Sequence, residues 1–310
     1  MFPPALTAAL DALLEGVSRK DLAARAAALS AAYRAGRSSG SIAGEADALA
    51  YALVRMPATH AVCEAVFARL LEVWPDFTPA TLLDVGAGPG TAGWAAHGAW
   101  PDVAITMLDA NAALRALAQR LAEAGGIKVE IRAGDLGAAK LPADLVVASY
   151  VLAELPQDRA ASVATDLWRD ARQALVLIEP GTPQGFARIR TARAALIAEG
   201  AHIAAPCTHD NECPMAGGDW CHFSQRLARS RDHMLLKDAN VPFEDERYSY
   251  AIAMRDKRSN GARILAPPSE AKPGLTFKLC NDSGLHAHFV PARDKEETRR
   301  VRRKGWGDLF

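Results

Sequence analysis

One short stretch of the sequence, "TLLDVGAGPGTAG" at residues 81–93, limits the folds available to this chain more than any other. An apolar run typical of a buried strand leads directly into Gly86, Gly88 and Gly90, and a helix is expected from about Thr91. Glycines at a turn from strand to helix let the backbone bend sharply and approach a ligand without a Cβ clash. The stretch therefore predicts an α/β fold with a ligand pocket at the end of its first strand.

Short apolar runs alternate with helical segments after this turn. The runs are "AITMLDA", "VEIRAGD", "LVVASY" and "ALVLIEP", and residues 112–124 and 160–173 are two of the helices expected between them. Such alternation predicts a parallel sheet with helices on both faces. Before it, residues 1–75 are rich in Ala and Leu and predict several helices, one of which Pro57 is expected to open.

The alternation ends after about residue 185, which indicates a different kind of structure near the C-terminus. The runs "RYSYAIAMR", "GARILAP", "LTFKLC" and "LHAHFV", separated by Pro/Gly turns, predict an antiparallel, β-rich end piece. We therefore expect a helical region at residues 1–78, a Rossmann-like cofactor domain at 79–200, and a cysteine-bearing, β-rich extension at 201–310.

The composition excludes several classes of protein. Lys plus Arg and Asp plus Glu number 36 each, so no global field marks a nucleic-acid or membrane binder. No apolar run approaches the ~20 residues that span a bilayer, and the first residues lack the pattern of a secretory or transit signal. The few cysteines, five in 310 residues, indicate a reducing compartment. We therefore expect a cytoplasmic protein that is not bound to a membrane.

The glycine turn fits two kinds of ligand. Gly88, Gly90 and Gly93 satisfy the G-x-G-x-x-G dinucleotide fingerprint, and Asp109 follows at about the expected distance. In the other reading, Asp84 precedes three alternate glycines, a pattern that resembles motif I of the S-adenosylmethionine-dependent methyltransferases. A carboxylate facing the turn would repel a pyrophosphate but would suit a ligand with an ammonium and a sulfonium. We therefore favour S-adenosylmethionine over a nicotinamide dinucleotide.

The resemblance to these methyltransferases implies a set of cofactor-binding residues. An acid before the glycines helps to hold the methionine end, which implies Asp84, and an acid ending the second strand binds the ribose, which implies Asp109. Asp135 would lie beside the adenine, and Ser149 lies where the fourth strand opens on the cofactor. The full predicted set is Asp84, Gly86, Gly88, Gly90, Asp109, Asp135 and Ser149.

No catalytic residue is assigned from the sequence. Amino-group methyltransferases often carry a proline-rich tetrapeptide after the fourth strand, whereas this chain has "SYVLAELP" there. Glu154 is the carboxylate of that stretch; it would orient a substrate or would instead be a helix-start carboxylate favoured by the helix dipole. Cofactor binding without methyl transfer therefore stays open as an alternative.

Three cysteines within one short segment predict a metal site. Cys207, Cys213 and Cys221 have the spacing C-x5-C-x7-C, and Cys280 follows in "FKLCND". The close cysteine pairs of structural zinc sites are missing, whereas an iron–sulfur core accepts looser spacings. Zinc, with help from His209 or His222, and a set of reduced cysteines without metal both stay open.

Together these residues resemble a known family, the methyltransferase-like assembly factors of the mitochondrial small ribosomal subunit and their bacterial relatives. The matching stretches are "YALVRMPATHAV", "LLDVGAGPGTAGWAA", "LVLIEPGTPQGF", "PCTHDNECP", "DWCHFSQRLARS" and "FEDERYSYAIAMR". The resemblance implies a class I methyltransferase fold and a 4Fe–4S cluster on Cys207, Cys213, Cys221 and Cys280. It also implies binding to small-subunit ribosomal RNA during late assembly, in the mitochondrial matrix for the organellar relatives.

Two basic stretches agree with an RNA partner. "RLARSRDHMLLK" contains Arg226, Arg229, Arg231 and Lys237, and the tail "RDKEETRRVRRK" is also strongly basic. We expect a protein that binds S-adenosylmethionine and an iron–sulfur cluster and acts on the small ribosomal subunit, by rRNA methylation or as an assembly factor. The alternative is a non-enzymatic RNA-binding factor with a degenerate pocket and a structural zinc site. Away from the ribosome we expect a monomer.

Overall fold

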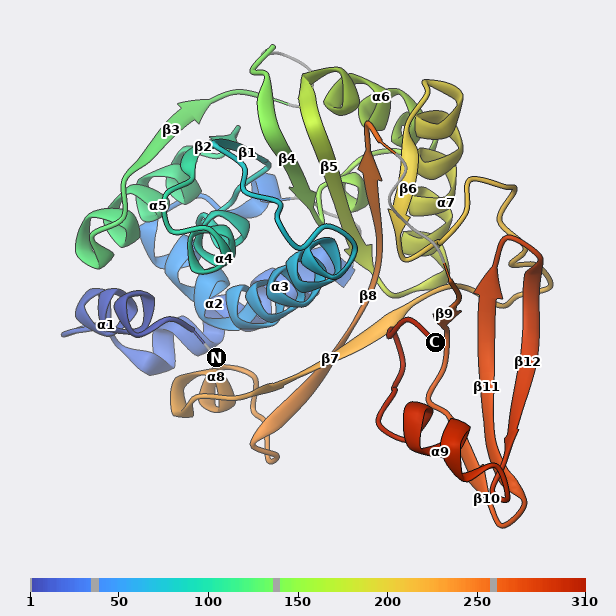
Figure 1. Cartoon of the computed structure of the whole chain (residues 1–310). Helices are drawn as coiled ribbons and strands as arrows, with labels where there is room; N and C mark the ends of the chain where they lie inside the picture. Colours follow the sequence, from blue (N-terminus) through green and yellow to red (C-terminus); the bar gives the residue numbers. More distant parts are fainter. Residues whose placement is uncertain (1, 35–38, 136–139, 257–260) are drawn as a thin grey trace.

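A computed structural model of the chain describes residues 2–34, 39–135, 140–256 and 261–310. Its main sheet has the strand order β3-β2-β1-β4-β5-β8-β6, with β7 also paired to β8 (Figure 1). The strands are β1 (Thr81–Val85), β2 (Ala104–Asp109), β3 (Val129–Ala133), β4 (Ala143–Ser149), β5 (Ala171–Pro180), β6 (His202–Ala205), β7 (Phe223–Ala228) and β8 (Phe243–Met254). The first five strands are parallel, and β8 runs antiparallel to β5. This is the Rossmann-like α/β sheet expected from the sequence, but it contains antiparallel as well as parallel strands.

Helices cover both faces of the sheet. One face carries α3 (Glu45–Val73), α4 (Thr91–Ala99) and α5 (Ala112–Gly125), with α1 (Pro4–Leu13) and α2 (Arg19–Arg34) packed outside them. The other carries α6 (Ala160–Asp170) and α7 (Pro183–Ala198). Among the described residues, no helix has the length and apolar character that crossing a membrane requires.

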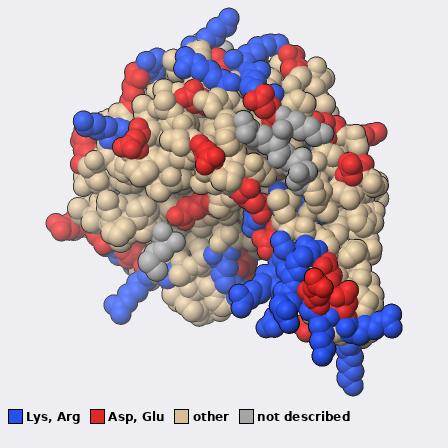
Figure 2. All heavy atoms as spheres, viewed as in Figure 1, with Lys and Arg blue, Asp and Glu red and all other residues tan. Residues whose placement is uncertain are grey.

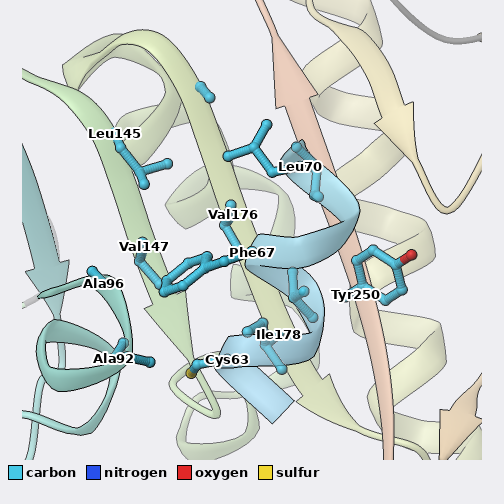
Figure 3. Close-up of a cluster of buried hydrophobic side chains, with 14 of the residues drawn as sticks. Cys63, Phe67, Leu70, Ala92, Ala96, Leu145, Val147, Val176, Ile178 and Tyr250 are labelled. Atoms are coloured by element: carbon cyan, nitrogen blue, oxygen red, sulfur yellow. The ribbon is translucent and has the colours of Figure 1, made fainter. Parts of the chain in front are cut away.

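The core is built from strands that are apolar on both sides, as parallel strands covered by helices require. In β5, Val176 and Ile178 face α3, where Phe67 and Cys63 pack against them (Figure 3). The intervening Leu175 and Leu177 belong to the cluster under α6 and α7. Cys63 is fully buried in this core.

Two features differ from the sequence expectation. The run "RYSYAIAMR" was expected in the end piece, but it forms most of β8, which pairs with β5 through seven residue pairs from Ala174↔Met254 to Pro180↔Tyr248. The main sheet therefore continues past residue 200. Pro57 was expected to open a helix, but it lies inside α3. The helix tolerates it although the missing N–H removes one backbone hydrogen bond.

The remaining strands form a separate small sheet, which we call the end piece. It contains β9 (Arg263–Ile264), β10 (Ser269–Ala271), β11 (Gly274–Asn281) and β12 (Gly284–Pro291), followed by α9 (Lys295–Val301). In Figure 1 it lies beside the main sheet, at the lower right.

Arg263 attaches the end piece to the rest of the molecule. Its guanidinium group is fully buried and donates to the carbonyls of Pro206 at 3.1 Å and Gly307 at 2.9 Å, and to Glu72 Oε2 at 2.6 Å. These partners belong to three separate parts of the chain: the cysteine segment, the C-terminal residues and α3. A buried arginine with several such bonds is costly to disrupt. It therefore fixes where the end piece lies against the cysteine segment.

Candidate cofactor pocket and cysteine site

A cavity of about 490 Å³ opens at the carboxyl ends of β1, β2 and β4. This is the edge where open parallel sheets bind their ligands. Five of the predicted cofactor residues line it, namely Gly86, Gly88, Asp109, Asp135 and Ser149. Glu154 also lines it, whereas Asp84 and Gly90 do not.

The glycine turn has the backbone that the sequence pattern requires. Gly86, Gly88 and Gly90 have φ angles of +68°, +56° and +85°, in the left-handed region that favours glycine. A Cβ built on Gly88 would have no protein atom within 4 Å, although Gly88 lines the cavity. The backbone of the turn is thus open to a ligand at this position.

Asp109 ties the end of β2 to the glycine turn. Its Oδ2 accepts a 2.7 Å hydrogen bond from the Gly88 N–H, and its Oδ1 accepts one of 2.7 Å from the Asn111 N–H. A carboxylate oxygen has two lone pairs, so each oxygen can accept a second hydrogen bond from a ligand hydroxyl. The arrangement suits the ribose-binding role expected for Asp109.

Asp84 lies in the protein interior instead of at the cavity. Its side chain is fully buried, its Oδ2 accepts a 3.1 Å hydrogen bond from the Gly93 N–H, and its Oδ1 has no partner. Burial raises the pKa of this carboxyl to about 7. The expectation that its charge faces the turn therefore does not agree with its position, and its visible role is to hold the turn from behind.

Tyr150, directly after β4, is a cavity residue that the sequence did not single out. It lines the cavity with φ of +60°, a left-handed conformation that is rare for residues other than glycine. Its hydroxyl donates to Glu246 Oε1 in β8 at 3.3 Å, and burial raises its pKa well above the usual value of a tyrosine. Strained backbone of this kind is concentrated at functional sites. No pattern in "SYVLAELP" reveals it.

Glu179, near the end of β5, holds the segment that follows β4. It is fully buried, its Oε1 accepts a 2.8 Å hydrogen bond from the Leu152 N–H, and its Oε2 has no partner. Burial raises its pKa to about 8. A glutamate within the otherwise apolar run "ALVLIEP" was the sequence signal for this residue.

The four cysteines of the predicted metal site come together. Cys207, Cys213, Cys221 and Cys280 all line one small cavity of about 30 Å³, although Cys280 comes from β11 and the others from the segment between β6 and β7. Most of the other lining side chains are apolar: Phe186, Ile189, Ile203, Pro206, Pro214, Met215, Ala251 and Leu265, with Tyr250 beside them. Within the described part of the chain, no three His, Cys, Asp or Glu side chains are arranged around a single-ion position.

The surroundings of the thiols combine burial with positive charge. Burial raises the pKa of Cys207, and the neighbouring Arg193 and Arg263 guanidinium groups oppose that increase. Burial also raises the pKa of Cys221 well above its usual value and that of Cys280 to about 12. Arg193 Nε and Arg263 Nη2 are buried without a hydrogen-bond partner. The cavity thus brings four sulfur ligands together, with Arg193 in its lining and Arg263 close to Cys207.

The two histidines considered as zinc ligands differ in position. His209 is buried, and its Nε2 lies 3.6 Å from Cys280 Sγ. His222 packs instead on the Trp220 ring, with 4.9 Å between ring centroids, and against Trp306 at 5.0 Å. Neither histidine is among the residues that line the cysteine cavity. Trp306 is thus a packing residue of the tail.

The two basic stretches also differ. In the first, Arg226 pairs with Asp245, and Arg229 and Lys237 both pair with Glu244, so most of its charge is neutralised internally. The tail carries exposed cations around α9, which we call the basic segment; Figure 2 shows Lys and Arg gathered over this part of the end piece. Its members without an ion pair to any described residue are Arg293, Lys295, Arg299, Arg302 and Arg303.

The strand order and the cavity define the class of protein. A parallel sheet ordered 3-2-1-4-5, extended by an antiparallel strand and carrying a glycine turn after β1, is the α/β Rossmann-like methyltransferase fold. A family model described as "Mitochondrial small ribosomal subunit Rsm22" matches residues 45–310, so the chain belongs to the Rsm22 family.

Two curated relatives place the chain within this family. "Ribosome assembly protein METTL17, mitochondrial" of Homo sapiens is 30% identical over 295 residues, which cover 86% of this chain and 63% of the relative. "Rsm22-cox11 tandem protein 2, mitochondrial" of Schizosaccharomyces pombe is 25% identical over 328 residues, covering 84% of this chain and 43% of the relative. The chain thus spans only part of the length of both. Both relatives are described as mitochondrial, so the expectation of a cytoplasmic protein finds no support here.

Solved methyltransferases resemble the structure more distantly. Magnesium protoporphyrin IX methyltransferase of Synechocystis, solved with bound S-adenosylmethionine, is 18% identical with a TM-score of 0.43, over 64% of this chain and 80% of its own. Precorrin-6y C5,15-methyltransferase of Geobacter metallireducens is 15% identical with a TM-score of 0.42, and the match covers 62% of this chain and 88% of that protein. The fold assignment therefore rests on the strand order of this chain.

The raised pKa of Glu179 predicts a pH-dependent stability. A carboxyl whose folded-state pKa is about 8, against an ordinary value of 4.5, contributes stability below its unfolded pKa and loses it as the pH rises through about 8. We expect Glu179→Gln to match the wild type near pH 5 and to exceed it by a few kcal/mol near pH 9. Urea unfolding at both pH values measures the difference. Parallel pH profiles for the two proteins would contradict the assignment.

Proposed function

We propose that this protein binds S-adenosylmethionine and a 4Fe–4S cluster and acts on the small ribosomal subunit, by methylating its RNA or by assisting its assembly. The observation that carries the proposal is that three cysteines of one short segment and Cys280 from β11 line one cavity next to a methyltransferase-type sheet. Family membership supports the ribosomal partner, since a relative is described as a ribosome assembly protein.

The cofactor cavity fits S-adenosylmethionine through its own residues. Asp109 would accept hydrogen bonds from the ribose hydroxyls with its remaining lone pairs. The open backbone at Gly88 would let the cofactor approach the turn. Asp135 would border the adenine, and Ser149 would border the methionine part of the cofactor. Asp84 would act indirectly by holding the turn. The bound cofactor would supply an activated methyl group, and the chain's contribution to transfer would be alignment of the two substrates.

The four cysteines that line one cavity match the ligand set of an iron–sulfur cluster, and their lack of close pairs disfavours a structural zinc site. Four thiolates are the usual ligand set of such a cluster. Their cavity is lined mainly by apolar side chains. Arg193 and Arg263 would offset the negative charge of the four coordinated thiolates. Because Cys280 belongs to β11, the cluster would join the end piece to the main sheet.

The basic segment supports RNA as the partner. Its unpaired cations lie on the end piece, which Arg263 and the cluster would hold in a fixed position. Lys and Arg side chains bind RNA phosphates without sequence specificity and with steep salt dependence. The end piece would therefore be the part of the protein that seats on ribosomal RNA.

The cofactor assignment predicts that Asp109→Asn weakens S-adenosylmethionine binding. The amide keeps the side-chain shape but loses the charge and one acceptor, so we expect about a tenfold increase in Kd, since hydrogen bonds to charged groups contribute about 1.5–3 kcal/mol. Calorimetric titration measures it, with Asp102→Asn, an exposed residue outside the cavity, as the matched control. Nicotinamide dinucleotide binding in place of S-adenosylmethionine would contradict the proposal.

The cluster assignment predicts that Cys213→Ser loses iron and exposes the end piece to protease, because metal binding is coupled to folding. Iron and sulfide content and limited proteolysis are measured on anaerobically purified protein. The control is Cys63→Ala, which changes a buried core cysteine outside the site. It should keep its iron and its resistance to protease. Unchanged iron content in Cys213→Ser would remove Cys213 from the ligand set.

The ribosomal assignment is tested by sedimenting the protein with immature small subunits and labelled S-adenosylmethionine. We expect co-sedimentation that a triple variant, Arg299→Glu, Arg302→Glu and Arg303→Glu, abolishes at moderate salt. The binding constant K falls as salt rises, and removing three phosphate contacts should reduce the steepness of log K against log salt by about 2. The control carries the same charge change at three exposed residues elsewhere: Lys20→Glu, Lys128→Glu and Arg172→Glu.

The same experiment separates the two modes of action. Label transferred to RNA indicates a methyltransferase, and co-sedimentation without transfer indicates an assembly factor that binds the cofactor. If the wild-type protein stays at the top of the gradient, the ribosomal proposal fails.

A further inference from the structure

One face of the end-piece sheet carries apolar side chains that stay exposed. β12 is an outer strand of this sheet (Figure 1). Its alternate residues Leu285, Ala287 and Phe289 lie on the same face, and all three are exposed. The exposed fraction is 38% for Leu285 and 48% for Phe289. A contiguous apolar stripe that stays exposed is typical of a binding surface.

The opposite face of the same strand is covered by the rest of the end piece. His288 packs its ring against Phe310, with 4.8 Å between ring centroids, and Val290 shares a buried cluster with Val301 of α9. Phe289 lies between these two residues in the strand, so its side chain is on the other, open face. No aromatic ring or guanidinium group of the described residues lies against the Phe289 ring. The ring is therefore available to a partner.

The strand register places two hydroxyl groups beside Phe289. Thr276 of β11 pairs with Phe289, and Ser269 of β10 pairs with Thr276, so the three side chains form one row across the open face. Directly paired side chains of antiparallel strands lie about 5 Å apart. Neither hydroxyl forms a hydrogen bond with another described residue. The row therefore offers a flat apolar surface with polar groups beside it, which suits a planar ligand with polar edges.

The end piece is also the positively charged part of the chain. Residues 261–310 contain ten Lys or Arg and six Asp or Glu, a net charge of +4, whereas residues 1–260 contain 26 and 30, a net charge of −4. Two exposed cations lie at the end of the sheet nearest Phe289: Lys272 between β10 and β11, and Arg293 just after β12. The Ala292 N–H donates to the Pro273 carbonyl at 2.8 Å, which keeps these two turns together. The charge favours a polyanion.

We propose that this open face binds single-stranded RNA, with one unpaired base stacked on Phe289. The inference rests on the RNA partner of the proposed function and specifies the form of the RNA and the side chain that takes a base. Proteins bind single strands by combining aromatic stacking with a cationic border. Thr276 and Ser269 would hydrogen-bond to the edge of the base, and Lys272 and Arg293 would contact the neighbouring phosphates. A duplex keeps its bases stacked internally, so it would contact the cations alone.

The test compares a short fluorescent oligouridine with an RNA duplex of the same length, by anisotropy titration of the full-length protein. We expect the single strand to bind more tightly, although the duplex carries more charge. Phe289→Ala should weaken oligouridine binding about tenfold, because a base stacked on an aromatic side chain contributes at least that factor. It should not change the steepness of log K against log salt, because it removes no phosphate contact. Phe289→Tyr keeps an aromatic ring and should bind like the wild type.

The matched control is Phe243→Ala, which removes an exposed phenylalanine of β8 outside the end piece and should leave binding unchanged. In a second measurement, an oligomer containing bromouridine is irradiated in the complex, and we expect the crosslink to map to β12. Because Phe289 is half exposed, its replacement should leave thermal unfolding nearly unchanged.

Three outcomes overturn the inference: equal binding of single strand and duplex, unchanged binding of Phe289→Ala, or a dimer of the free protein that Phe289→Ala disrupts. The dimer would assign the open face to a second copy of the chain. If the triple variant of the basic segment still weakens RNA binding in these cases, the RNA partner of the proposed function stands. If the wild type binds neither RNA, both fail.

Discussion

The antiparallel pairing of β8 with β5 is the interaction on which the rest of the structure depends. β8 is twelve residues long and also pairs with β6 and β7, so it is fixed along its whole length. Its Glu246 accepts the hydrogen bond from Tyr150 at the cofactor pocket, and its Tyr250 lines the cysteine cavity. Glu244, near its start, forms ion pairs with Arg229 and Lys237. A displacement of this one strand would alter both the cofactor pocket and the cysteine cavity.

The cysteine cavity occupies the junction between this sheet and the end piece. Arg263 joins the cysteine segment to α3 and the C-terminal residues, and Thr208 Oγ1 donates to the Gly261 carbonyl at 2.9 Å. These contacts hold the end piece without metal, and under our proposal the cluster adds a direct link through Cys280. The basic segment would then face RNA from a surface that Arg263 and the cluster hold together. Loss of the cluster would weaken docking without changing any RNA-contacting side chain.

The sequence predicted the parts of this account that depend on local chemistry. The left-handed glycines after β1, the acid that ends β2 and the four cysteines each follow from residue type and spacing, and the structure brings Asp109 to the cavity and the cysteines to one place. Long-range pairing was not predictable in the same way. The run "RYSYAIAMR" has the composition of a strand in any sheet, and only its partner β5, some seventy residues earlier, decides where it lies. The direction of the Asp84 side chain also depends on the packed structure, as does the strained backbone of Tyr150.

The central claim is that the four cysteines hold an iron–sulfur cluster at the junction with the end piece. Mössbauer spectroscopy of the iron-labelled protein, purified without oxygen, tests it most directly, because it reports the iron nuclearity and valence in the intact chain. The account predicts the signal of a cubane of four irons in a sulfur environment, lost when the cysteines are replaced. A protein that contains stoichiometric zinc and no iron, or no metal at all, would contradict it.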